Sequence, residues 1–159
     1  KQSLYSDVMH IDGQKFLITT CEPLQLTLQC PLTSESQTQL GLGLQGHLSI
    51  LRSKGFNPTI IYTDPAKGFA GLVGAFPGVI VDTSGAGDNV AKVDAKIRRI
   101  KELYRSVKKG LPWRLPAVMV KDLVAYSVSR LNIRRTTAIN QNVCPKVLFT
   151  GVKVNFKKE

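Results

Sequence analysis

The sequence predicts an α/β fold with a mixed sheet of five strands and helices on both faces. Two observations carry this prediction. The first 30 residues hold apolar runs, the third strictly alternating with polar residues, separated by turn signals, as in antiparallel strands. After residue 55, short and continuously apolar runs alternate with segments of helical length, which is typical of parallel strands joined by crossovers.

The opening strands are predicted from turn residues and β-rich runs. We expect strands over residues 6–11 and 15–21, joined by a tight turn at Asp12-Gly13. A third strand is expected over 24–30, where apolar and polar residues alternate. Asp12 is then a turn residue, whereas Asp7 lies inside a strand that enters the core and needs another explanation.

The first helix is predicted from its two ends. Ser and Thr residues at 33–36 offer N-caps, and the helix is expected to run to about Lys54 and to end at Gly55. Glycines inside a helix lower its stability, so we interpret them as sites of close packing against the sheet. They are Gly41, Gly43 and Gly46.

The second half of the chain predicts two buried strands and two more crossover elements. The run 58–64 reads as a buried central strand that ends in an aspartate, and 78–82 reads as another. Between them, 65–76 is expected to be a helix that begins at a proline. A glycine-rich loop, 83–89, leads into a long basic helix over 90–109.

The chain is expected to finish with helices. After a proline-rich turn at 110–116, a helix is predicted over 117–134 from its apolar stripe. A short helical turn and an exiting tail complete the chain.

Composition suits a single domain of an intracellular protein. The chain has 159 residues, of which 43% are hydrophobic and 21% charged. We find neither a membrane-spanning run nor a signal peptide, so we expect no membrane partner, and a start at Lys1 is expected for a fragment. Cys21, Cys30 and Cys144 are too scattered for a disulfide framework or a zinc site, so reduced thiols are expected.

The charge is the first indication of function. Twenty-two Lys and Arg residues against eleven Asp and Glu residues give a net charge of +11. This balance favours a polyanionic partner, and nucleic acid is the usual one. The excess is concentrated in three runs, 96–109, 130–135 and 153–159. Each run taken alone is also compatible with a solvated surface, but three together favour nucleic acid.

Acidic residues at strand ends suggest a metal site. Asp7 lies on the first strand and Asp64 ends the fourth, so the two carboxylates reach one edge if those strands are neighbours. Asp94 on the basic helix is the candidate for a third acid. Three carboxylates suit Mg²⁺ or Mn²⁺, and two such ions stabilise the attacking and leaving oxygens of a phosphodiester exchange.

The basic helix offers a cationic face beside this acid. Residues four, seven and eleven positions after Asp94 share its face, and they are Arg98, Lys101 and Arg105. An acid followed by such a stripe suits a helix that lies along a nucleic-acid backbone. The alternative is a surface helix with ordinary ion pairs, such as Asp94 with Arg98.

Four segments together resemble the catalytic core of retroviral and retrotransposon integrases. "DVMHIDGQKFLITTC" (7–21) resembles the opening strand of that core, and "TIIYTDPAKGF" (59–69) resembles the segment around its second acid. "VDTSGAGDNVAKVDAKIRRIKELYR" (81–105) resembles its flexible loop and catalytic helix, and "NVCPKVLFTG" (142–151) a segment after the core. The likeness is greatest to the Copia-like group, within the RNase H-like superfamily.

The resemblance implies a fold and an activity. The fold is the RNase H-like sheet, with three antiparallel strands followed by two parallel ones. Residues 1–140 would form the catalytic core and 141–159 a basic C-terminal extension. The implied activity is a metal-dependent polynucleotidyl transferase that processes DNA 3′ ends and transfers them into target DNA for a retrotransposon-like element.

The resemblance also implies site residues and a cofactor. Asp7, Asp64 and Asp94 would hold two Mg²⁺ (or Mn²⁺) ions. The DNA backbone would contact Lys92, Arg98, Lys101 and Arg105, with a contribution from the 85–89 loop.

Two departures from the family pattern leave alternatives open. The third acid is an aspartate where the family has a glutamate, and it follows Asp64 by only 30 positions, fewer than in relatives. Pro65 also replaces the usual asparagine. Glu102, at 38 positions from Asp64, is therefore an alternative third ligand, and a degenerate site is a further one.

The resemblance finally implies partners and a location. Relatives carry a zinc-binding module before this core and a basic module after it, and neither is visible here. Relatives form dimers through the core, for which the Trp113 region and the 117–134 helix are candidate surfaces. A nuclear location, or one within a virus-like particle, is expected. Two rival functions remain, namely a decayed or domesticated DNA-binding scaffold and an RNase H-type nuclease that cuts RNA–DNA hybrids.

Overall fold

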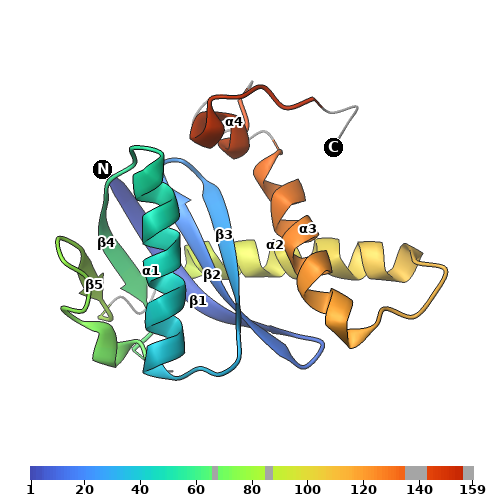
Figure 1. The fold of residues 1–159 in the computed structure, drawn as a ribbon, viewed down its shortest axis with the longest axis horizontal. Coiled ribbons are helices and arrows are strands. Elements are labelled where there is room, and N and C mark those ends of the chain that lie inside the picture. The colour runs from blue at the N-terminus through green and yellow to red at the C-terminus, as the bar shows by residue number, and fades with distance from the viewer. Residues whose placement is uncertain (66–67, 85–87, 135–142, 156–159) are drawn as a thin grey trace.

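The sheet has the mixed topology that the sequence predicts. A computed structural model describes the 159-residue chain except 66–67, 85–87, 135–142 and 156–159. Five strands lie in the order β3-β2-β1-β4-β5 (Figure 1). β1 is antiparallel to β2, and β2 to β3, whereas β4 is parallel to both β1 and β5. The strands are β1 (Gln2–Ile11), β2 (Gln14–Glu22), β3 (Leu26–Leu32), β4 (Pro58–Thr63) and β5 (Ile80–Asp82).

Helices cover both faces of the sheet, and each face has its own core cluster. The helices are α1 (Gln37–Ser53), α2 (Asp88–Gly110), α3 (Val120–Asn132) and α4 (Pro145–Thr150), with 3₁₀ turns η1 (Ala70–Leu72) and η2 (Ala117–Met119). Because side chains of a strand alternate between faces, Leu4 and Val8 of β1 pack in the cluster with α1. Tyr5 and Met9 pack in the cluster with α2 and α3. None of the helices described is long and apolar enough to cross a bilayer.

The predicted hairpin is confirmed, and its turn residues have the conformation it requires. Ile11 pairs with Gln14 across a two-residue turn. Asp12 has a φ of 47° and Gly13 a φ of 74°, as a type I′ turn requires at both central positions. The hairpin therefore fixes the register that carries Asp7.

The glycines of α1 pack closely at two positions. At Gly43 an added Cβ would lie 2.7 Å from Leu17 Cδ2 of β2, so the predicted packing against the sheet is confirmed there. At Gly41 an added Cβ would instead lie 3.3 Å from Leu72 Cδ2 of η1. At Gly46 nothing lies within 4 Å, and the prediction is wrong for that residue.

The helix predicted over 65–76 is wrong. In the described part of that range only η1 is helical. Gly68 and Gly74 have φ values of 79° and 77°, a left-handed backbone that interrupts a right-handed helix. The helix predicted over 117–134 is also divided, into η2 and α3.

Two further boundaries differ from the prediction. β1 begins at Gln2 rather than residue 6, since it pairs with β4 from its first residue. β5 is limited to Ile80–Asp82. The predicted boundary between 140 and 141 lies outside the described residues. After this boundary, Phe149 of α4 stacks on Phe56 with ring centroids 5.8 Å apart, so α4 packs against the core cluster that α1 covers.

Candidate active site and nucleic-acid interface

Asp7 and Asp64 leave the sheet from neighbouring strands and from the same face. Ser6 of β1 lies opposite Thr63 of β4 in the parallel register, and the two acids are the next residues. Two positions before each acid, Tyr5 and Tyr62 stack with ring centroids 5.1 Å apart in the cluster under α2. Because side chains two positions apart in a strand share a face, Asp7 shares the face of Tyr5. Asp64 is the residue directly after β4, and a continuation of the strand direction would put it on the face of Tyr62.

Both carboxylates are half-buried, so each is partly shielded from water. Asp7 accepts a hydrogen bond of 2.7 Å from the Val8 N–H to its Oδ1, and Asp64 follows directly on β4. Two carboxylates at neighbouring positions concentrate negative charge at this edge of the sheet, which attracts a cation. Paired carboxylates are also the hard oxygen ligands that Mg²⁺ and Mn²⁺ prefer.

α2 packs on the same face of the sheet and presents two different flanks. Val93, Ile97 and Tyr104 pack against the sheet. Lys92 Nζ donates to Glu22 Oε2 at 2.9 Å and to the Tyr5 hydroxyl at 3.2 Å. The ion pair with Glu22 is the main cause that raises the pKa of Lys92. Lys92 therefore anchors the N-terminal part of α2 to β1 and β2.

Asp94 lies on the other flank of α2. Successive helical residues are about 100° apart, so Lys92 and Asp94 leave the helix on opposite sides of buried Val93. Because Lys92 reaches Glu22 on β2, the flank of Asp94 is turned away from β2, on the side of β1 and β4. Its side chain is exposed.

The structure brings no three acids of its described residues around one point. Among the residues it describes, no three Asp, Glu, His or Cys side chains are placed to hold a metal ion. It brings Asp7 and Asp64 to one face and leaves Asp94 on the adjacent helix flank. Glu102 lies on the solvent side of α2, opposite the buried line, and pairs with Arg99 at 3.4 Å. Of the two candidates for the third acid, only Asp94 lies on the flank that is turned toward the side of β1 and β4.

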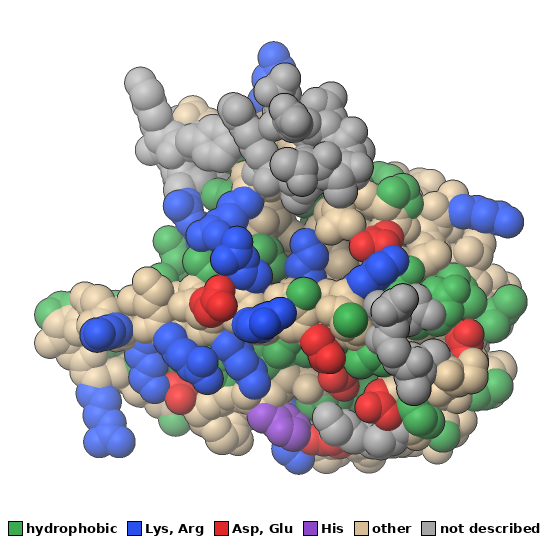
Figure 2. Space-filling model, turned by 180° about the vertical axis from the view of Figure 1, so that it is seen from behind, with side chains coloured by type: hydrophobic (Ala, Val, Ile, Leu, Met, Phe, Trp, Pro, Cys, Tyr) green, Lys and Arg blue, Asp and Glu red, His purple; other side chains and the backbone are tan. Residues whose placement is uncertain are grey.

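The predicted basic stripe forms one flank of α2. Arg98, Lys101 and Arg105 follow Asp94 at helical spacing, and their phase relative to buried Val93 and Tyr104 puts them on the flank of Asp94. Lys92 is on the opposite flank. Figure 2 shows Lys and Arg side chains along the length of α2, and acidic side chains gathered beside its part over the sheet.

Asp12 has a second role that the sequence did not indicate. Its Oδ2 accepts hydrogen bonds from the Tyr104 hydroxyl at 2.6 Å and from Lys108 Nζ at 2.5 Å. The hydrogen bond from Lys108, followed by that from Tyr104, holds the pKa of Asp12 below its ordinary value. The hairpin tip is thereby tied to the C-terminal half of α2.

A buried polar network lies behind the acids, on the α1 face. Ser6, directly before Asp7, shares a 2.9 Å hydrogen bond with Thr19, and Thr19 shares one of 2.8 Å with His47 Nδ1. Burial lowers the pKa of His47 to about 4, against a smaller opposing effect of the Gln29 carbonyl. The other histidine, His10, contacts the Glu35 carboxylate at the surface.

Comparison with known proteins identifies the fold. No family model and no curated protein matches the chain. Among solved structures, the catalytic core domain of BIV integrase matches with a TM-score of 0.66, over 94% of this chain and 93% of that domain. The sequences are 12% identical, so the match shows the fold alone. The chain has the RNase H-like fold of an integrase catalytic core, and the likeness to the Copia-like group stays a prediction.

Proposed function

We propose that this chain is a metal-dependent polynucleotidyl transferase core, which processes DNA 3′ ends and joins them to target DNA for a retrotransposon-like element. The observation that carries the proposal is the pair Asp7 and Asp64 on adjacent parallel strands of an integrase-core fold. The pair lies on the face that α2 covers, and a flank of α2 carries the cationic stripe.

The residues fit a divalent metal in part. Asp7 and Asp64 supply hard oxygen ligands at neighbouring positions, and they would hold Mg²⁺ or Mn²⁺. Asp94 is the proposed third ligand, because its flank is turned toward the side of β1 and β4, although it is shorter than the glutamate of relatives. When bound, two such ions stabilise the attacking and leaving oxygens of a phosphodiester exchange.

The cationic stripe would position the DNA. Arg98, Lys101 and Arg105 extend along one flank of α2 and would contact successive phosphates. Such contacts give affinity that is largely independent of sequence and falls with salt. The net charge of +11 favours association with the polyanion as a whole. A contact between Lys92 and DNA would require its ammonium to leave Glu22.

The second candidate is a DNA-binding scaffold without catalysis. It is favoured by one observation, the lack of any three-acid metal cluster among the residues described. A core homodimer, flanking zinc-binding and basic modules, and a location in the nucleus or a virus-like particle are parts of the integrase proposal.

The test is cleavage and disintegration of a branched DNA in Mg²⁺ or Mn²⁺, with an RNA–DNA hybrid as a second substrate. Asp64→Asn keeps the side-chain shape and should abolish activity, and Asp94→Asn should do so if Asp94 is the third ligand. Glu102→Gln is the matched control and should remain active; loss there instead would assign the third role to Glu102. Calorimetric titration with Mn²⁺ tests binding independently, and Asp7→Asn should weaken it.

The outcomes separate the candidates. DNA binding without any metal-dependent cleavage or Mn²⁺ binding favours the scaffold. Preferential cleavage of the hybrid favours an RNase H-type nuclease. Activity that survives Asp64→Asn refutes the proposed acid pair.

A further inference from the structure

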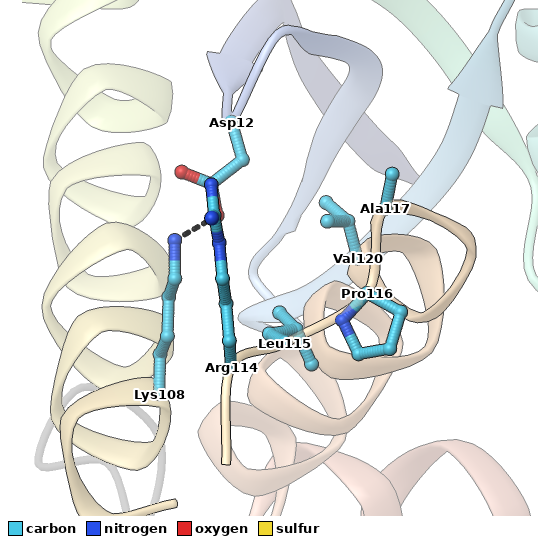
Figure 3. Close-up of a pocket in the computed structure, with 7 residues that line it drawn as sticks. All are labelled: Asp12, Lys108, Arg114, Leu115, Pro116, Ala117 and Val120. Atoms are coloured by element: carbon cyan, nitrogen blue, oxygen red, sulfur yellow. Dashed lines mark hydrogen bonds and ion pairs between the residues drawn. The ribbon is translucent and has the colours of Figure 1, made fainter.

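A pocket of about 540 Å³ lies where the hairpin tip, the C-terminal half of α2 and the connection to α3 meet (Figure 3). Its size is within the range of pockets that bind small ligands. One wall is charged, with Asp12, Lys108 and Arg114. The opposite wall is mainly apolar and includes Leu115, Pro116 and Val120. Figure 3 shows the Lys108 and Arg114 side chains side by side, both extending toward Asp12.

The charged wall has an excess of positive charge. Asp12 is already engaged by Lys108 and the Tyr104 hydroxyl, and Arg105 is close enough to act on it electrostatically. Two cations, Lys108 and Arg114, therefore line the pocket against the single carboxylate of Asp12, and Arg105 adds positive charge nearby. Arg114 is exposed, and its planar fork of donors suits an oxyanion such as a phosphate.

The pocket continues the line of the cationic stripe. Arg98, Lys101, Arg105 and Lys108 recur every three or four residues, so the stripe leads along one flank of α2 into the pocket. At a rise of 1.5 Å per residue, Lys108 lies about 21 Å along the helix from Asp94. At 3.4 Å per nucleotide of one strand, that distance corresponds to about six base pairs of duplex.

We propose that this pocket is a phosphodiester-binding subsite of the DNA interface, about six base pairs from Asp94. It rests on the proposed function. Arg114 and Lys108 hold one backbone phosphate, and the wall formed by Leu115, Pro116 and Val120 contacts the adjoining sugar.

The lining favours a DNA backbone over a free nucleotide. Reading a base requires directed polar groups, and the wall opposite the cations is mainly apolar. The Ala117 carbonyl, on that side of the pocket, already accepts a hydrogen bond of 2.7 Å from Gln14. A phosphate and sugar need only the charge and the apolar surface that are present.

The experiment measures binding of a fluorescent duplex by anisotropy at several salt concentrations, in the Asp64→Asn background so that no cleavage interferes. Arg114→Met should weaken binding and reduce the slope of log affinity against log salt by about 0.9, the effect of one lost phosphate contact. Arg114→Lys should restore most of the slope. Lys54→Met removes an equal charge at the C-terminal end of α1 and is the matched control, expected to leave the slope unchanged.

Further arms distinguish the source of the phosphate and the failure of the wider proposal. Deoxyadenosine monophosphate and inorganic phosphate at millimolar concentration should not compete with the duplex; saturable competition that depends on Arg114 overturns the DNA assignment. An unchanged slope in Arg114→Met, with binding by the parent intact, also overturns it. The DNA assignment is also overturned if Arg114→Met loses binding to polyglutamate and keeps binding to the duplex, which would assign the pocket to an acidic peptide. If the parent binds no DNA, the proposed function itself fails. Thermal unfolding verifies that each variant is folded.

Discussion

Lowering the pH should destabilise this protein through His47. The side chain is 2% exposed, and its Nδ1 pairs with the Thr19 hydroxyl. Within the described structure its Nε2 makes no well-formed hydrogen bond, although the Gln29 carbonyl lies close enough to oppose a smaller part of the effect of burial. The imidazolium form carries a second N–H and a charge into this buried position, so burial lowers the pKa of His47 to about 4.

The sign and size follow from proton linkage. The pKa of His47 is depressed in the folded state, while in the unfolded chain it returns to about 6.5. Between these values the unfolded chain binds a proton that the folded chain does not, so stability is present above pH 6.5 and is lost as the pH falls. The loss attributable to His47 is about 2 kcal/mol at pH 5 and about 3 kcal/mol at pH 4.

The assay is urea unfolding followed by circular dichroism at pH values from 8 to 4, for the parent and for His47→Asn. The asparagine retains a polar group near the Thr19 hydroxyl and removes the titration. Its absolute stability will differ, so the compared quantity is the change with pH. Carboxylates such as Asp12 contribute equally to both proteins, and the difference between the two curves isolates His47.

An NMR titration supplies the second measurement. The chain has only two histidines, and His10→Gln removes one imidazole signal and so assigns the other. The reasoning is refuted if the signal of His47 titrates near pH 6.5, or if His47→Asn and the parent lose stability in parallel.

Three other predictions concern packing, the sheet edge and the basic helix. Gly46→Ala should stabilise the protein by up to about 1 kcal/mol in urea unfolding, since nothing lies within 4 Å, whereas Gly43→Ala should gain less or destabilise because its methyl group meets a buried leucine at 2.7 Å. Asn132→Ala should lower the unfolding free energy by about 1–2 kcal/mol, because the Asn132 amide accepts from the Thr27 N–H at 2.8 Å and donates to the Thr27 carbonyl at 2.7 Å, on the edge strand β3. An unfolding free energy equal to that of the parent contradicts this prediction. Lys92→Met should lower the unfolding free energy by less than about 1 kcal/mol and leave DNA affinity nearly unchanged. Arg98→Met should leave the unfolding free energy nearly unchanged and weaken DNA binding, and thermal unfolding and anisotropy measure the two effects.

The sequence was informative wherever the relevant physics is local. Asp12-Gly13 requires a type I′ turn, and that turn fixes the register of β1 against β2. The continuous apolar run predicted as a strand over 58–64 is β4, an interior strand between β1 and β5, although β1 and not β4 is the central strand of the five. The 3.6-residue period predicted one flank for Asp94 and Arg98, and α2 is a continuous helix across both residues.

Long-range contacts account for most of what the sequence could not indicate. Lys92 pairs with Glu22 across 70 positions, and the Asp12–Tyr104 hydrogen bond spans 92, so no local pattern reveals either. The helix wrongly predicted over 65–76 has a different cause, the backbone conformation of two glycines. Its residue types permit a helix, but Gly68 and Gly74 adopt a left-handed backbone that only the folded context selects.

Two ties hold α2 at opposite ends, and together they determine where its flanks point. At the N-terminal half, Lys92 binds Glu22 and Tyr5; at the C-terminal half, Tyr104 and Lys108 bind Asp12. Both ties involve the β1–β2 hairpin, which also carries Asp7. The hairpin therefore fixes the rotation of α2 about its axis relative to Asp7. As a result, Asp94 and the cationic stripe lie on the flank turned toward the side of β1 and β4. Since a rotation by one residue, about 100°, would turn Asp94 away from β1 and β4, these two ties would influence function by orienting α2, in addition to the phosphate contact proposed for Lys108.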